Sequence, residues 1–303
     1  MTLKPMTFDT YAQLKPYFQA QRYPLCSYSL PSIIAWTNDN FSPGWTVVDG
    51  VLVVGAEFRH PKDSRHLILP VAPGKEFAPE ELRGLAEELG FDNYWFVCQD
   101  YLDRHGREAI KALFTIEPQD EYTDYVYHAR DLADLRGSRY AKKRNLIKQF
   151  MNSHVDDGRV EFAPIKGENA EECADFVEEW CAERDCDADP NNDLACEKMA
   201  MLNTLAHIDD LDVRGMLLRV DGELSALAVA ADLTATMGVL HFEKAFSHIK
   251  GLYQYFDQQC AQRLFNGHVF INKESDMGVP GLAKAKKSYY PAMMVESFKL
   301  TIK

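Results

Sequence analysis

One predicted helix carries a run of basic side chains whose positions suggest anion binding. The helix is expected over residues 138–154, and its first turns hold Lys142, Lys143 and Arg144. At about 100° per residue, Lys143 falls within the apolar arc of this helix and Arg144 lies at the edge of that arc. A lysine on a core-facing stripe is costly to bury alone. Lys143 therefore either extends to the rim or meets a structural carboxylate, or it projects into a cleft and holds an anionic group.

A second candidate site is the turn that leads from a predicted strand into a predicted helix. The strand over 236–246 contains Glu243, and the helix over 252–265 follows Lys250 and Gly251. Free backbone amides at a helix N-terminus attract anions. Gly251 permits a close backbone approach, and Lys250 adds a positive charge. An ordinary strand-to-helix turn has the same residues and is the simpler interpretation of this segment taken alone.

The third candidate site is the loop and helix that follow the predicted strand over 268–272. Ligands of α/β folds tend to bind where strands end. Here Glu274 or Asp276 is a candidate general base, and one of the two tyrosines, Tyr289 or Tyr290, is a candidate proton donor. Alternatively, Asp276 only caps a helix and the nearby lysines face water.

Composition and charge exclude several classes of protein. The chain has 303 residues, with 33 basic and 46 acidic side chains and a formal net charge of −13. That charge argues against a protein that coats nucleic acid, so no stable nucleic-acid complex is expected. Seven cysteines without a Cys-x-x-Cys pair indicate no metal site. No apolar run of about 20 residues and no secretory signal are present, which predicts a cytoplasmic protein without a transmembrane segment.

The same order of elements occurs twice along the chain. Asp49-Gly50 and Asp221-Gly222 each join two β-rich runs, which is a strong hairpin signal. The elements expected after the first hairpin are a strand over 65–71, a helix over 79–89, a strand over 93–98 and a helix over 101–113. Those expected after the second are a strand over 236–246, a helix over 252–265, a strand over 268–272, a helix over 281–288 and a closing strand over 292–300. This pattern predicts an α/β (α+β) protein of two domains, 1–120 and 121–303.

The candidate segments together resemble one protein family. The quoted stretches are 137–150, 242–255 and 271–291, and the last adds Asn272, Lys284 and Lys286 to the candidates. They are similar to the bacterial family of the C-terminal catalytic domain of phosphatidylglycerol lysyltransferase. The resemblance covers essentially the whole chain. It implies two tandem GNAT-like (acyl-CoA N-acyltransferase) domains, each with a mixed, mostly antiparallel sheet flanked by helices.

The resemblance also implies a function. An acyl or aminoacyl group would move from acyl-CoA or aminoacyl-tRNA to an amine or hydroxyl of a soluble acceptor, with no covalently bound cofactor. Glu243, Glu274 or Asp276 would be the base and Tyr289 the acid. The residues expected to bind anionic or substrate groups are Lys143, Arg144, Lys250, Gly251, Asn272, Lys284 and Lys286.

One departure from the family pattern bears on the donor. The usual glycine-rich pyrophosphate loop is reduced to residues 248–251, which weighs against coenzyme A. The alternative is a non-catalytic module that binds a ligand or RNA on a degenerate GNAT scaffold.

Overall fold

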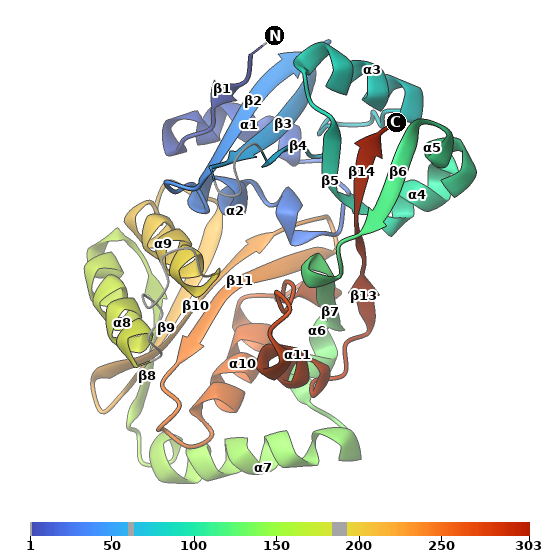
Figure 1. The fold of residues 1–303 in the computed structure, drawn as a ribbon. Coiled ribbons are helices and arrows are strands. Elements are labelled where there is room, and N and C mark those ends of the chain that lie inside the picture. Colours follow the sequence, from blue (N-terminus) through green and yellow to red (C-terminus); the bar gives the residue numbers. More distant parts are fainter. Residues whose placement is uncertain (1, 60–63, 184–192) are drawn as a thin grey trace.

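Two mixed β-sheets form the framework of the molecule, as Figure 1 shows. The computed structural model describes residues 2–59, 64–183 and 193–303. In spatial order, the first sheet contains β1 (Lys4–Pro5), β2 (Phe41–Val48), β3 (Val51–Phe58), β4 (Ser64–Leu67), β5 (Asn93–Cys98), β14 (Ser297–Ile302) and β6 (Phe114–Pro118). The second contains β13 (Met293–Val295), β7 (Asp124–His128), β12 (Phe270–Asn272), β11 (Met237–Ala245), β10 (Glu223–Asp232), β9 (Val213–Val220) and β8 (Val160–Ile165).

Both sheets follow the same pairing pattern. Within the described residues, neighbouring strands are antiparallel except for one parallel pair in each sheet, β4–β5 in the first and β11–β12 in the second. The expected mixed, mostly antiparallel sheets are therefore confirmed. The two hairpins form because Asp49 and Gly50, and likewise Asp221 and Gly222, adopt positive φ angles. Those angles belong to the tight turns whose twist matches the flanking strands.

The last strand of the chain crosses from one sheet to the other. The sequence predicts one closing strand over 292–300, but the structure has two, separated at Glu296. β13 pairs with β7 in the second sheet, whereas β14 pairs with both β5 and β6 in the first. The predicted domain over 121–303 therefore supplies its final strand to the first sheet. Pairing partners decide this placement, and they lie far away in the sequence.

Helices cover both sheets. Those of the first half are α1 (Tyr11–Phe18), α2 (Leu30–Ala35), α3 (Pro79–Leu89), α4 (Gln99–His105) and α5 (Arg107–Leu113). Those of the second half are α6 (Ala129–Asp134), α7 (Ala141–Phe150), α8 (Ala170–Ala182), α9 (Asp193–Ala206), α10 (Leu252–Arg263) and α11 (Pro280–Lys287). The helix predicted over 101–113 divides into α4 and α5 at Gly106, whose φ is +80°. Across the described residues, the structure has no helix with the length and apolar character to span a bilayer.

Three apolar clusters hold these layers together. One cluster fills the first half and continues into the second sheet through Met237 and Val239. A second packs α6, α7 and α10 on one face of the second sheet, and a third packs α8 and α9 on the other face. The two halves thus share a continuous core, and contacts between them can contribute to a site.

Candidate functional site

The parallel pair β11–β12 opens partway along its length. β12 pairs with β11 only over Met237–Val239, while β11 continues to Ala245. The β10–β11 register also shifts between Leu240 and Phe242, so His241 is an extra residue in β11. A bulge of this kind re-aims side chains and is common beside functional sites. The second half gathers its buried polar groups around this opening.

Three buried charges form the centre of the site, which we call the charged cluster. It consists of Glu243 on β11, Asp257 on α10 and Lys273 directly after β12. Lys273 Nζ donates to Glu243 Oε2 at 2.8 Å and to Asp257 Oδ1 at 2.6 Å. The exposed fractions of these side chains are 15% for Lys273, 7% for Glu243 and 4% for Asp257. Two carboxylates and one ammonium give the cluster a formal charge of −1.

Burial shifts the pKa values of the charged cluster. It raises the pKa of Glu243 to about 7, and the Asp257 carboxylate acts in the same direction. Burial acts to lower the pKa of Lys273, but the two carboxylates outweigh it and raise that pKa well above its usual value. Lys273 therefore stays protonated while Glu243 titrates near neutral pH. Glu243 Oε1 is buried and has no hydrogen-bond partner among the described residues, so it is available to accept a proton.

Lys143 and Tyr289 flank the charged cluster. Lys143 Nζ donates to Ser288 Oγ at 2.8 Å and lies 3.8 Å from the centre of the Tyr289 ring. Burial lowers the pKa of Lys143, and the Asp257 charge opposes this shift. Burial, and then the Asp257 carboxylate, raise the pKa of Tyr289 well above its usual value, so its phenol keeps its proton. Among the residues that the structure describes, Lys143 makes no ion pair with a carboxylate, which was one of the alternatives for its role.

The three segments singled out in the sequence meet at this site. α7 supplies Lys143, and the loop after β12 leads to Tyr289. Gly251 begins α10 with φ of +82°, and a Cβ there would lie 2.3 Å from the Leu146 carbonyl oxygen of α7. The close approach that this glycine permits is therefore an approach by α7. Lys250 beside it is exposed, and its role in binding an anion stays a prediction.

Arg144 and Lys284 lie outside the charged cluster. Arg144 Nη1 donates to the carbonyl oxygens of Leu135 at 2.5 Å and Gly137 at 2.7 Å, so it fixes the turn before α7. Lys284 is exposed on α11. Arg144 already donates to two backbone carbonyl oxygens, whereas Lys284 can contact a ligand at the surface of α11. The role of either residue in binding an anion stays a prediction.

Lys286 and Asn272 hold the backbone that carries the site. Lys286 Nζ donates to the carbonyl oxygens of Lys273 and Ser275, both at 2.6 Å. The Asn272 amide donates to Asp124 at 2.7 Å. Burial of Asp124 raises its pKa to about 6. These contacts place Lys286 and Asn272 as supports of the loop, whereas the sequence predicts that they bind substrate.

The carboxylates of Glu274 and Asp276 belong to networks separate from the charged cluster. Asp276 accepts hydrogen bonds from the Tyr125 hydroxyl at 2.5 Å and from the Gly278 backbone N–H at 2.9 Å. Glu274 Oε1 lies 2.8 Å from Nδ1 of His241. Of the three candidate bases, only Glu243 lies in the charged cluster.

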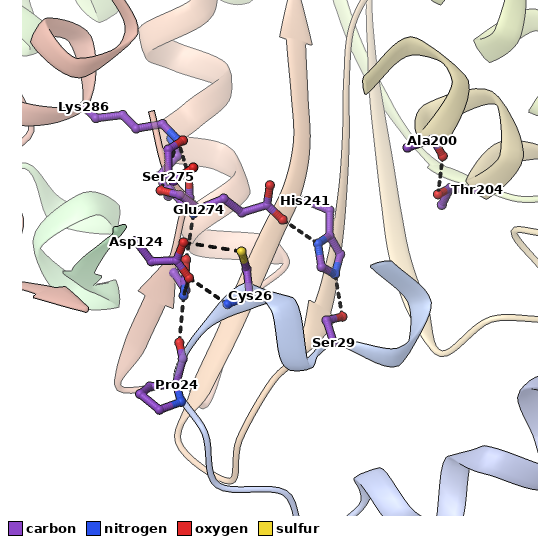
Figure 2. Close-up of polar contacts among 12 residues, drawn as sticks. Pro24, Cys26, Ser29, Asp124, Ala200, Thr204, His241, Glu274, Ser275 and Lys286 are labelled. Carbon is purple, nitrogen blue, oxygen red and sulfur yellow. Dashed lines mark hydrogen bonds and ion pairs between the residues drawn. The ribbon is translucent and has the colours of Figure 1, made fainter. Parts of the chain in front are cut away.

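Figure 2 shows that the network of Glu274 and His241 continues into the first half of the chain. His241 Nε2 lies 2.9 Å from Oγ of Ser29, so Ser29, His241 and Glu274 form one chain of hydrogen bonds, here called the serine relay. Ser29 and His241 are 212 residues apart in the sequence.

Four residues of these networks were not among the site candidates predicted from the sequence: Ser29, His241, Asp257 and Lys273. Two of them have a local signal. Asp257 follows Tyr253 by one helical turn on the buried face of α10, where an acidic residue is unusual. Lys273 lies in the quoted segment beside Glu274. Ser29 and His241 carry no such signal, because only the packing of the two halves joins them.

Comparison with known proteins places this arrangement in a family. The family model for the C-terminal part of phosphatidylglycerol lysyltransferase matches residues 68–300. The chain belongs to this family. The match includes the whole charged cluster and the parallel pair β11–β12, and it confirms the resemblance inferred from the motifs.

Solved structures resemble this member of the phosphatidylglycerol lysyltransferase C-terminal family along nearly its whole length. A conserved protein of unknown function from Bacteroides thetaiotaomicron matches with a TM-score of 0.87 and 27% identity, covering 99% of each chain. The C-terminal domain of a putative lysylphosphatidylglycerol synthetase from Agrobacterium fabrum matches with a TM-score of 0.62 and 11% identity, covering 97% of this chain and 92% of that one.

A tandem GNAT protein from the clavulanic acid biosynthesis pathway has a TM-score of 0.45 and 10% identity, over 98% of this chain and 97% of that one. No curated protein matched this family member. The expected pair of mixed sheets flanked by helices is confirmed, and the family supports a transferase in general.

Proposed function

We propose that this protein transfers an acyl or aminoacyl group from a carrier, either acyl-CoA or aminoacyl-tRNA, to an amine or hydroxyl of a soluble acceptor. The charged cluster beside Lys143 is the observation that carries this proposal. Buried charges are costly, and groups with strongly shifted pKa values are concentrated where acid–base chemistry occurs. The family name, which refers to lysyl transfer, supports an aminoacyl donor.

Glu243 is the general base in this proposal. Its raised pKa lies near neutral pH, where a base works best, and Oε1 is free to accept a proton. The Glu243 carboxylate, when ionised, attracts a cationic group, while the neighbouring Lys143 ammonium offsets the formal charge of −1 on the charged cluster. The acceptor that fits this site best is therefore an amine that arrives protonated and loses its proton to Glu243.

Lys143 is the group that binds the donor. Its ammonium has three N–H donors, and the bond to Ser288 uses one of them. The other donors are available to a phosphate or carbonyl oxygen of the carrier. Tyr289, held in its protonated form beside Lys143, is placed to protonate the leaving group.

Each bond that forms in the proposed transfer is matched by a bond that breaks. Glu243 removes a proton from the acceptor ammonium, and the amine nitrogen attacks the carbonyl carbon of the donor. The new C–N bond forms as the C–S or C–O bond to the carrier breaks. The leaving thiolate or alkoxide takes a proton from Tyr289. Glu243 returns the proton it removed to Tyr289 through solvent, and the new amide nitrogen releases its remaining extra proton to solvent. The Lys143 ammonium stabilises the oxyanion of the tetrahedral intermediate.

A transfer assay tests this function. Lysyl-tRNA and acetyl-CoA are supplied in turn as labelled donors, with a panel of small amines and alcohols as acceptors. With the productive pair, Glu243→Gln should lower kcat by about 100-fold or more, because general-base catalysis contributes about 10²–10⁴. Lys143→Met should raise KM for the donor and also lower kcat, because Lys143 stabilises the oxyanion as well as binding the donor.

Two matched variants control for general damage. Lys148→Met removes an exposed lysine from the same helix, and Glu172→Gln removes a carboxylate that pairs with Arg219 on β9. Both should keep the wild-type rate. A Glu243→Gln variant with wild-type kcat contradicts the assigned base. Donor binding without turnover on every acceptor favours the non-catalytic alternative.

A further inference from the structure

The serine relay has the geometry of an activated nucleophile. A carboxylate can only accept hydrogen bonds, so neutral His241 must donate from Nδ1 to Glu274, across 2.8 Å. Nε2 then carries the lone pair and accepts the Ser29 hydroxyl proton across 2.9 Å. A hydroxyl bonded to a base that a carboxylate orients is the arrangement that activates serine for acyl transfer.

Two irregular backbone positions hold the relay together. His241 is the extra residue of the β11 bulge. Glu274 adopts a φ of +59°, a backbone conformation that is strained for a non-glycine residue. Ser29 itself is fixed because its N–H donates to the Cys26 carbonyl at 2.9 Å and its carbonyl accepts from the Ile33 N–H at 3.0 Å. Each member of the relay is therefore placed in advance.

Ser29 also lines a cavity. A cavity of about 640 Å³ lies between the first helices of the chain and the second sheet, and Tyr28, Ser29 and Leu30 form part of its wall together with Leu233. Ser29 is only 2% exposed, so a reacting group must reach it through this cavity. The relay is thus buried against solvent but borders a space large enough for a small molecule.

The charged side chains of this cavity are already paired. Lys15 lies 2.8 Å from Asp212, and Arg214 lies 2.8 Å from Asp232, which also contacts His268 at 3.0 Å. Together with the apolar wall beside Ser29, this pairing leaves no excess charge to hold a phosphate. The cavity suits an uncharged acyl ester.

We propose that Ser29 accepts an acyl group from an activated ester to form a covalent acyl-serine, with His241 as its base and Glu274 orienting His241. The Ser29 oxygen attacks the carbonyl carbon while its proton moves to His241 Nε2. The C–O bond to Ser29 forms, the bond to the leaving group breaks, and His241 returns the proton to the leaving group. This step is separate from transfer at Glu243, and an incoming nucleophile releases the acyl group.

The test uses p-nitrophenyl acetate, without any carrier or acceptor, so its outcome does not depend on the proposed transfer. Wild-type protein should release p-nitrophenolate in a burst that saturates at one acetyl group per chain. Peptide mapping by mass spectrometry should locate that group on Ser29. His241→Asn should slow acetylation of Ser29 by about 100-fold or more, since it removes the base.

Further variants separate the relay from general reactivity. Ser29→Ala should lose the burst, Ser29→Cys should keep it as a hydroxylamine-sensitive thioester, and Ser32→Ala on the same helix should match wild type. Mapping of the wild-type protein decides the matter even where a variant fails to fold. An unlabelled Ser29, or labelling that His241→Asn leaves unchanged, overturns the proposal and leaves the relay as a structural link between the halves.

Discussion

The two parallel strand pairs occupy the same place in their sheets, yet their surroundings differ in kind. Beside β4–β5, the rings of His66 and Trp95 stack with centroids 4.4 Å apart, and Phe58 lies against both. Burial lowers the pKa of His66 to about 3, so this ring is neutral. Beside β11–β12, Lys273 and its two carboxylates occupy the opening. Aromatic side chains pack beside β4–β5, whereas charged side chains occupy the opening between β11 and β12.

The helices that connect the two strands of each pair also differ in charge. α3 has Glu80 and Glu81 in its first turn, and Glu81 accepts the backbone N–H of Ala78 at 2.8 Å. Acidic side chains at a helix N-terminus satisfy its amides and repel a second anion. α10 has no acidic residue in its first turn. A repeated fold therefore need not repeat a site, and the charged cluster lies in the second half.

The largest effect should come from Lys273→Met. It leaves the carboxylates of Glu243 and Asp257 buried without their cation, which should lower the free energy of unfolding by about 3–5 kcal/mol. Urea denaturation measures this change. Lys299→Met, which removes a surface partner of Glu117, should change stability by less than about 0.5 kcal/mol. If the two variants were equally stable, this would contradict the role of Lys273 in stabilising the buried carboxylates of Glu243 and Asp257.

A smaller difference is expected between two glycines of the two halves. Gly90 ends α3 with φ of +73° and open space around it, so Gly90→Ala should cost about 1 kcal/mol. Gly251→Ala adds a clash with the Leu146 carbonyl to the same strain and should cost about 2–4 kcal/mol. Thermal unfolding compares the stabilities of the two variants. A smaller loss of stability in Gly251→Ala than in Gly90→Ala would show that α7 moves away from the added methyl group readily.

The pH dependence of stability should differ between wild type and Glu243→Gln. The folded pKa of Glu243 is raised from 4.5 to about 7, so the folded state holds a proton that the unfolded state has lost between these values. Wild-type stability should therefore fall relative to Glu243→Gln as pH rises from 4.5 to about 7. Asp124 shifts in the same direction but is present in both proteins. Urea denaturation of both proteins at several pH values measures this change. A difference in unfolding free energy that stays constant between pH 4.5 and about 7 would refute the raised pKa of Glu243.

The smallest effect is expected from His66→Phe. The change keeps the ring stack and removes a buried Nδ1 that has no partner among the described residues. Unfolding free energy should therefore stay within about 1 kcal/mol of wild type or rise. Transfer activity should be unaffected. A marked loss of transfer would place part of the active site in the first half.

Local sequence signals predicted much of the fold. α3 and β5 lie over the predicted ranges 79–89 and 93–98, and both Asp-Gly turns close hairpins. These elements depend on periodicity and on turn residues that tolerate positive φ, which are properties of a few neighbouring residues. The closing segment over 292–300 was predicted wrongly as one strand, because its two parts find partners in different sheets.

The sequence by itself identified Lys143, Glu243 and Tyr289 as candidates, because charge on an apolar stripe and polar groups at strand ends are visible locally. Only the tertiary structure decided which groups meet. Lys273 joins Glu243 to Asp257, and His241 joins Glu274 to Ser29, through contacts across as many as 212 residues. The shift in the pKa of Glu243 likewise depends on burial and on neighbouring charges, which exist only once the chain has folded.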